Sequence, residues 1–221
     1  MKNVTAIIVA AGSGLRFGSP KQFALLRGRP VLAWSLDVFE SHPRIGAIVV
    51  VLPDEKLGRD LKDGHKKITA VVTGGEQRQD SVFAGLLRVD PRRTTIVLVH
   101  DGARPLVTAE IIDRVIEGAE KKGAAVPVLA LDDTVKEIKR GAVVRTLDRE
   151  TLVRVQTPQG FALDLFQRAL DRARADGFTG TDDAALVERL GAPVAAVRGE
   201  ARNIKITSPG DIRSAEALLD D

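Results

Sequence analysis

Arg16 and Lys21 are the residues whose type and spacing in this sequence best suit a chemical role. They stand in and just after a turn that has glycine at positions 12, 14 and 18. Glycine lets the backbone approach a ligand closely with φ above zero, so that N–H groups point at phosphate oxygens. The two cations would supply formal charge for the same oxygens. The segment therefore predicts an anion-binding loop; a flexible surface turn with solvated cations is the alternative.

The loop matches neither of the two common glycine-rich phosphate motifs. A dinucleotide-binding GxGxxG needs glycine where Phe17 stands, and its acidic partner would come too late, at Asp54. A Walker A loop needs glycine and then lysine at a fixed spacing, which neither Gly12 nor Gly14 has. The loop therefore belongs to another class of anion-binding site.

A second polar cluster follows the strand-like run 95–100, where Asp101 and Arg104 stand. In open α/β sheets ligands bind outside the carboxyl ends of the strands, so these side chains should face the same crevice as the first loop. The Asp101 carboxylate is a hard oxygen ligand suited to Mg²⁺. An Asp–Arg pair on the surface is the alternative interpretation.

Apolar runs of strand length alternate with runs of helical spacing, which predicts an α/β protein of one domain over residues 1–221. Strands are expected at 4–11, 45–52, 68–73, 95–100, 124–129, 194–197 and 203–207. Helices are expected at 30–39, 54–61, 163–175 and 208–219. Three more are expected to start at Ser81, after a Thr108 cap with an end at 122, and after a Thr181 cap.

Residues 132–149 break this alternation with a polar hairpin that turns at Arg140-Gly141. Such a hairpin has little apolar surface to bury in its own domain, so it is expected to project and to pair with another subunit. An exposed hairpin without a partner is the alternative.

Composition excludes several classes of protein. The 221-residue chain has no cysteine, which excludes disulfides and thiolate metal sites, and no apolar run approaches membrane-spanning length. Aromatic residues make up only 4% of the chain, so it has few side chains on which the bases of a nucleic acid could stack. A net charge of +3 suits small anionic substrates. These features predict a cytoplasmic protein that binds neither membrane nor nucleic acid.

Motifs along the whole chain resemble those of the 2-C-methyl-D-erythritol 4-phosphate cytidylyltransferase (IspD) family. In chain order they are AAG-x-G-x-R at 10–16, PKQ at 20–22, GG-x-x-R-x-x-SV at 74–82, HD-x-ARP at 100–105, DT-x-K at 133–136, DR at 148–149, TPQ at 157–159 and NIKIT at 203–207. Only Gly102, often alanine in relatives, departs from the pattern. Each string alone is short, and their order from Ala10 to Thr207 carries the resemblance.

The resemblance implies a doubly wound, mostly parallel α/β sheet of the Rossmann-like nucleotidyltransferase type, with a protruding β-arm at about 133–156 that interlocks a homodimer. It implies transfer of CMP from CTP to 2-C-methyl-D-erythritol 4-phosphate, with release of pyrophosphate and with Mg²⁺ or another divalent cation as cofactor. Two alternatives remain: a sister cytidylyltransferase acting on ribitol 5-phosphate or another polyol phosphate, and a non-catalytic nucleotide-binding regulatory module.

The resemblance also implies three groups of site residues. Nucleotide contacts are expected from Ala10, Ala11, Gly12, Gly14, Gly75, Glu76, Ser81 and Asp101, with Asp101 also a possible metal ligand. Acceptor contacts are expected from Arg104, Thr134, Arg149, Thr157 and Lys205. Catalytic roles are expected for Arg16, Lys21, Arg149 and Lys205, because an ionised phosphate nucleophile needs no general base, and repulsion between anions limits the reaction.

Overall fold

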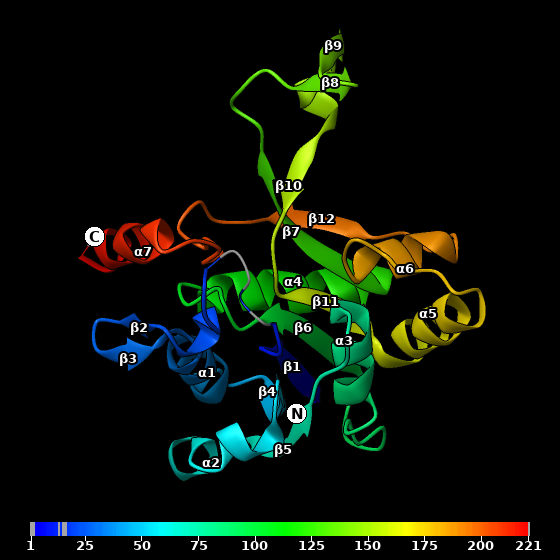
Figure 1. Ribbon diagram of the computed structural model, residues 1–221. Coiled ribbons are helices and arrows are strands. Elements are labelled where there is room, and N and C mark those ends of the chain that lie inside the picture. Colours follow the sequence, from blue (N-terminus) through cyan, green and yellow to red (C-terminus); the bar gives the residue numbers. More distant parts are fainter. Residues whose placement is uncertain (1–2, 13, 15–16, 221) are drawn as a thin grey trace.

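A mostly parallel sheet forms the centre of the computed structural model, which describes residues 3–12, 14 and 17–220 (Figure 1). Within these residues the main sheet has eight strands, in the order β10-β7-β11-β6-β1-β4-β5, and β12 also pairs with β7. They are β1 (Val4–Val9), β4 (Ile45–Leu52), β5 (Ile68–Thr73), β6 (Ile96–Asp101), β7 (Ala124–Ala130), β10 (Val153–Val155), β11 (Gln159–Ala162) and β12 (Ala195–Arg198). The expected strands from 4 to 129 and at 194–197 are thus confirmed to within a few residues.

Strand β1 lies inside the sheet, because it pairs with another strand along each of its edges. It pairs in parallel with β4 on one side and with β6 on the other, so the ends Val9 and Asp101 lie next to each other. Alternate residues of β1 face opposite cores: Ala6 and Ile8 pack in one, and Ile7 packs in the other. This two-sided burial explains why its sequence is almost continuously apolar.

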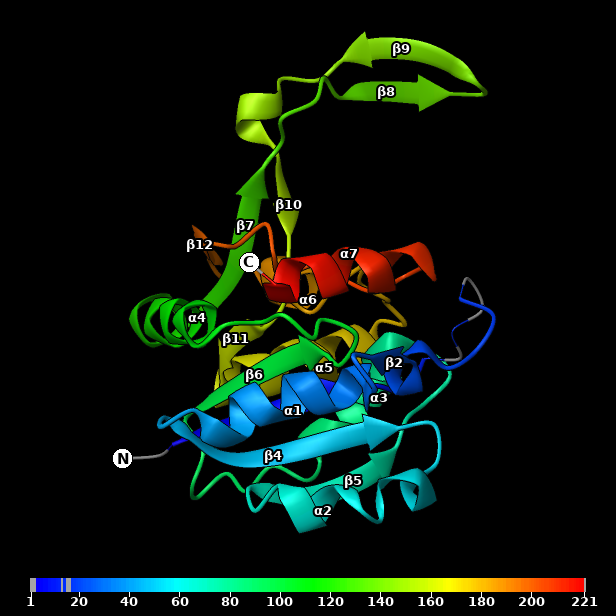
Figure 2. The same cartoon turned by 90° about the vertical axis from the view of Figure 1, so that its left-hand side faces the viewer.

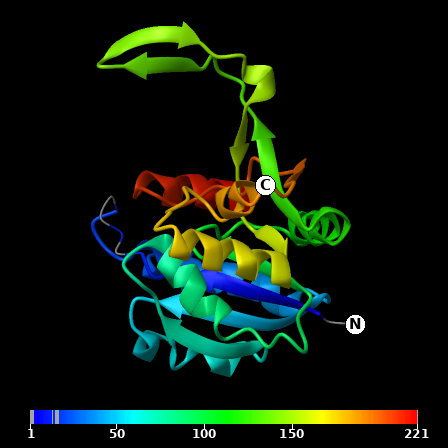
Figure 3. The ribbon, with the colours of Figure 1, turned by 90° about the vertical axis from the view of Figure 1, so that its right-hand side faces the viewer.

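Helices cover both faces of the sheet, as a doubly wound fold requires (Figures 2 and 3). On one face lie α1 (Val31–Ser41) and α4 (Ala109–Lys122); on the other lie α3 (Arg78–Leu86), α5 (Leu163–Ala175) and α6 (Ala184–Arg189). The remaining elements are peripheral: η1 (Lys21–Phe23), β2 (Leu25–Leu26), β3 (Arg29–Pro30), η2 (Glu55–Gly58), α2 (Leu61–Gly64) and α7 (Gly210–Asp220). None of the helices in the described residues is both long and apolar enough to cross a membrane.

The predicted arm projects away from the sheet (Figure 1). It rises on β7, forms the separate hairpin of β8 (Lys136–Lys139) and β9 (Ala142–Thr146), and returns through η3 (Arg149–Thr151) and β10. Arg140 and Gly141 both have positive φ, 51° and 80°, which is the backbone of a two-residue hairpin turn. The Arg140-Gly141 turn is therefore confirmed.

Three expectations about local structure are wrong. Residues 203–207 form no strand; the segment instead lies against the loop after β6 through an Ile206 N–H to Ala103 O bond of 2.8 Å. Thr181 does not cap α6, because Asp182 Oδ1 accepts the bond from the Ala185 N–H, at 3.0 Å. The polar stretch expected as one helix at 54–61 forms only the short 3-10 helix η2, and α2 begins at its last residue, Leu61.

Candidate active site

A cavity of about 400 Å³ opens where β1 and β6 end, at the edge predicted from the sequence. Nine of the predicted site residues line it: Ala10, Ala11, Gly12, Lys21, Gly75, Glu76, Ser81, Asp101 and Lys205. The lining thus joins the first loop, the segment after β5, the end of β6 and the chain before α7. Arg16 lies outside the described residues, and Gly14 is placed in the first loop but does not line the cavity.

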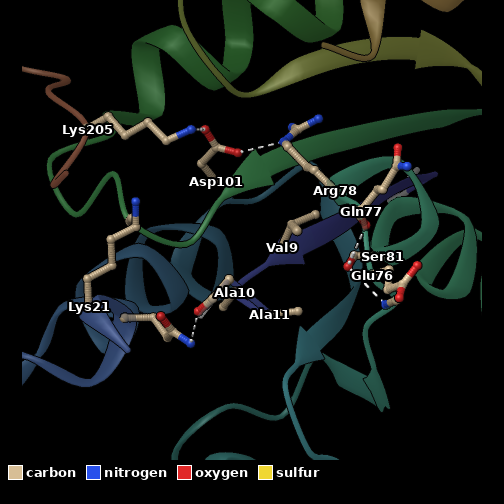
Figure 4. Close-up of a pocket in the computed structure, with 14 residues that line it drawn as sticks. Val9, Ala10, Ala11, Lys21, Glu76, Gln77, Arg78, Ser81, Asp101 and Lys205 are labelled. Atoms are coloured by element: carbon tan, nitrogen blue, oxygen red, sulfur yellow. Dashed lines mark hydrogen bonds and ion pairs between the residues drawn. The ribbon is translucent and has the colours of Figure 1, made fainter. Parts of the chain in front are cut away.

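The first loop turns sharply at Gly14. Its φ is +69°, and a Cβ there would lie 1.8 Å from the Ser19 carbonyl oxygen, so only glycine fits. The Gly14 carbonyl accepts bonds from the N–H groups of Phe17 and Gly18, at 2.8 and 2.9 Å. The chain then enters η1, which begins at Lys21 and brings that side chain to the cavity (Figure 4).

The segment after β5 packs directly against the first loop. A Cβ on Gly74 would lie 2.3 Å from the Ala11 Cβ, so glycine allows the two turns to approach each other. Ser81 shapes the segment: its Oγ accepts from the Gly75 N–H and donates to the Gln77 carbonyl, each at 3.2 Å. The first loop and the segment after β5, which carry the residues predicted to contact the nucleotide, therefore form one continuous wall of the cavity.

Asp101 is the centre of the charged lining, and it is only 7% exposed. Its Oδ2 lies 2.6 Å from Lys205 Nζ and 3.9 Å from Arg104 Nε, whereas its Oδ1 lies 3.1 Å from Arg78 Nε (Figure 4). Burial alone would raise the pKa of Asp101, but Arg78 and then Lys205 outweigh it and hold that pKa far below its usual range. The carboxylate is therefore ionised at neutral pH.

Arg78 and Asp183 are members of this cluster that sequence reasoning missed. Arg78 Nη1 lies 2.8 Å from Asp183 Oδ2, and the Asp183 side chain is only 2% exposed. The two residues stand within the short strings GG-x-x-R and TDD. The two strings could have marked both residues as candidates. Their pairing joins positions far apart in the chain, however, and no local pattern predicts it.

Buried polar groups behind Asp101 fix the end of β6. Thr157 Oγ1 accepts from the Asp101 N–H at 3.0 Å and lies 3.2 Å from His100 Nδ1. Arg104 Nη1 donates to the Asn203 carbonyl at 2.7 Å, which ties the loop after β6 to the segment that carries Lys205. Neither Arg104 nor Thr157 lines the cavity. In this structure both therefore support the site from behind.

The remaining predicted acceptor residues lie on the arm. Thr134 and Arg149 are exposed, and the Arg149 guanidinium donates to the Asp132 carbonyl at the arm's base. Neither lines this chain's cavity. A single chain therefore brings together the nucleotide-side residues, Lys21 and Lys205, but not the two arm residues.

The described residues contain no group of three or more His, Asp or Glu side chains placed to hold a metal ion. Asp101 is the one predicted ligand, and both of its oxygens already face cations. This donor set does not fit a metal ion held by the protein itself. A cation here would have to be held mainly by substrate oxygens.

Comparisons with known proteins agree across almost the whole chain. Residues 4–221 match the model of the IspD family, described as 2-C-methyl-D-erythritol 4-phosphate cytidylyltransferase. The protein of that name from Symbiobacterium thermophilum is 47% identical over 221 residues, which cover 99% of this chain and 93% of that protein. The one from Acidobacterium capsulatum is 43% identical, with 98% and 97% covered.

Solved structures also match almost the whole chain. The crystal structure of 2-C-methyl-D-erythritol 4-phosphate cytidylyltransferase from Thermus thermophilus has a TM-score of 0.82 and 39% identity, and covers 97% of this chain and 98% of its own. That of the 4-diphosphocytidyl-2C-methyl-D-erythritol synthase from Anaerococcus prevotii has a TM-score of 0.88 and 35% identity, with 100% and 99% covered.

Proposed function

The chain belongs to the 2-C-methyl-D-erythritol 4-phosphate cytidylyltransferase family, and from this premise we propose how its residues carry out the reaction. The enzyme transfers CMP from CTP to 2-C-methyl-D-erythritol 4-phosphate. An acceptor phosphate oxygen bonds to the α-phosphorus, the bond from that phosphorus to the bridging oxygen breaks, and pyrophosphate leaves with the electron pair. The observation that carries the assignment to this cavity is that Lys21 and Lys205 both line it.

In this proposal the protein contributes position and positive charge. The nucleophile is already an anion, so no proton needs to be removed, and what limits the rate is repulsion between anions and the charge that develops on pyrophosphate. Lys21, together with Arg16, is proposed to stabilise that developing charge. Lys205 is proposed to hold the acceptor phosphate in line with the α-phosphorus.

The nucleotide is proposed to lie across this wall of the cavity. The base would face Gly75, Glu76 and Ser81, and the triphosphate would lie over the backbone of residues 10–12, where N–H groups after a strand can meet phosphate oxygens. Before substrate binds, both oxygens of Asp101 face cations, Lys205 and Arg78. We therefore propose that Mg²⁺, or another divalent cation, enters bound to the triphosphate of CTP, where it neutralises phosphate charge.

The acceptor half of the site is proposed to be completed by a second copy of the chain. Thr134 and Arg149 stand on the arm, and the arm carries large exposed apolar side chains, among them Ile138 (70%) and Val143 (63%). Exposed apolar surface of this kind is typical of an interface. A homodimer joined through the arms would bring Thr134 and Arg149 of one subunit to the cavity of the other. A cytoplasmic location stays a prediction.

Pyrophosphate release from purified protein tests the assignment. Protein, CTP and Mg²⁺ are combined in parallel with 2-C-methyl-D-erythritol 4-phosphate and with ribitol 5-phosphate. Release with the first alone is expected. Release with ribitol 5-phosphate alone would keep the mechanism and change the acceptor, whereas CTP binding without release from either would favour the regulatory module.

A further inference from the structure

Arg78 occupies a position that the helix itself does not favour. It is the first residue of α3, where the helix dipole is positive and a cation is unfavourable. The capping box between Gln77 and Asp80 already completes that terminus, with Gln77 N donating to Asp80 Oδ2 at 3.1 Å. Helix stability therefore does not explain an arginine here, and its partners must.

Those partners are two carboxylates on different sides of the guanidinium. Arg78 Nε faces Asp101 Oδ1 at 3.1 Å, and Nη1 faces Asp183 Oδ2 at 2.8 Å. Burial opposes the charged form of Arg78, but Asp183 and Asp101 outweigh it and keep its pKa above the usual value. The guanidinium is thus a permanent bridge between the end of β6 and the segment before α6.

The two oxygens of Asp101 have separate partners. Oδ1 is held by Arg78, whereas Oδ2 faces Lys205 at 2.6 Å. If Lys205 is to meet a substrate phosphate, it must leave Asp101, and a carboxylate that is 7% exposed cannot lose its partners without a large desolvation cost. Arg78 removes that difficulty, because Oδ1 stays paired when Lys205 departs.

We propose that Arg78, anchored by Asp183, is a positioning residue that holds Asp101 so that Lys205 can pass from this carboxylate to the acceptor phosphate. The proposal rests on the proposed phosphate contact of Lys205. Figure 4 shows the arrangement, with Lys205 and Arg78 reaching Asp101 from opposite sides. Without Arg78, Lys205 would be the nearest cation left to Asp101, since Arg104 Nε is 3.9 Å away.

A double-mutant cycle between Arg78 and Lys205 tests this. Arg78→Gln is expected to lower kcat/KM for the acceptor on the order of 10- to 100-fold, because Lys205 stays on Asp101. In a Lys205→Met background the same change should cost less than about threefold, because no lysine remains to be released. The Kd of CTP, measured by calorimetry without acceptor, should change by less than about threefold in Arg78→Gln.

Two further variants separate positioning from folding. Arg78→Gln with Asp183→Asn removes both charges of the pair and leaves no unpaired carboxylate at the buried Asp183, so it should recover much of the Tm lost in Arg78→Gln while keeping the lowered kcat/KM. Arg88→Gln is the matched control, because it removes the same charge from an exposed arginine just beyond α3, and it should behave as wild type. If Arg78→Gln does not fold, Asp183→Asn alone takes its place in the cycle.

The outcomes distinguish this proposal from the one on which it rests. Unchanged acceptor kinetics in Lys205→Met would remove the phosphate role of Lys205, and the positioning role with it. Two other outcomes would overturn only the positioning role, provided that Lys205→Met itself lowers kcat/KM for the acceptor. In one, Arg78→Gln costs the same in the wild-type and Lys205→Met backgrounds. In the other, Arg78→Gln greatly weakens CTP binding. Arg78 would then be a structural support of the nucleotide wall.

Discussion

The cluster around Asp101 and the arm use the same kinds of charged residue in opposite ways. Around Asp101 the ions are mostly buried: the Asp101 and Asp183 side chains are 10% and 2% exposed. On the arm, Arg145 and Glu137 form an ion pair whose side chains are 68% and 44% exposed. A charge matters energetically when water cannot replace its partner, so the two regions should respond very differently to mutation.

The apolar residues show the reverse difference. Around the cavity they are buried or partly buried, whereas on the arm Ile138 and Val143 form an exposed cross-strand pair. The ion pairs of the interior cluster lie within one chain, whereas the exposed apolar residues of the arm are available for the proposed contact with a second copy of the chain. The predictions below contrast the two regions.

The largest effect is expected for Lys21 in the cavity. Lys21→Ala should lower turnover by on the order of 10²- to 10⁴-fold with little change in CTP affinity, because its contact strengthens as charge develops on the leaving pyrophosphate. Pyrophosphate release and calorimetry measure the two quantities. Lys139→Ala on the arm removes the same charge and should leave turnover unchanged. Normal turnover in folded Lys21→Ala would end the proposed role.

The buried cluster should also make stability depend on pH. Burial lowers the pKa of His100 to about 3, and its ring nitrogens face Arg104 O and Thr157 Oγ1. The unfolded pKa is about 6.5, so the stability from neutral His100 is present above pH 6.5 and is lost as pH falls toward 3, by up to about 1.4 kcal/mol per unit.

Urea unfolding of wild type and His100→Asn between pH 7 and pH 4 measures this dependence. The wild-type free energy of unfolding should fall more steeply with acidification than that of the variant, since the other titrating groups are shared by both proteins. Parallel curves would show that His100 is not held neutral. The arm contains no histidine and should contribute nothing to the difference.

A smaller effect on activity is expected from the arm. Ile138→Asp should convert a dimer into a monomer in light scattering, because a charge replaces an apolar contact at the proposed interface. Activity should fall by about tenfold if Thr134 and Arg149 complete the partner's site. Leu87→Asp is the matched control, since Leu87 is 67% exposed but lies off the arm. A wild-type monomer, or a dimeric Ile138→Asp, would contradict the proposed interface.

The smallest effect is expected for the exposed ion pair of the arm. Glu137→Gln breaks the Arg145 contact of 2.5 Å and should change the free energy of unfolding by less than about 1 kcal/mol. Asp183→Asn breaks a buried pair and should cost about 3 kcal/mol or more. Urea unfolding compares the two. Equal losses would mean that burial does not determine how much these ion pairs contribute to the free energy of unfolding.

Much of the fold could be predicted because its signals are local. The apolar runs that became β1 and β4 are buried on both faces, and Thr108 caps α4 through its own hydroxyl at 3.3 Å. The place of the cavity followed as well, since the carboxyl ends of parallel strands share one edge. Arg16 lies outside the described residues, so its expected role stays a prediction.

Other features could not be predicted because they depend on partners far along the chain. The segment around Lys205 has the alternating pattern of a strand, yet it pairs with no strand of the sheet. Ile206 instead packs in a separate small core with Leu26 and α7. Thr181, Asp182 and Asp183 are all acceptable caps by type. Only the approach of the chain to α6 puts Asp183 at the N-cap position and lets Asp182 accept the bond from Ala185.

By itself, then, the sequence determined the strands, the glycine turns and the cations near the carboxyl ends of the parallel strands, because hydrophobic periodicity and backbone freedom act over a few residues. Tertiary structure alone decided which charges meet. Arg78 bridges Asp101 and Asp183, and Lys205 reaches the same carboxylate from the far end of the chain. Such pairing depends on where buried surfaces come together, which only the packed sheet and its helices establish.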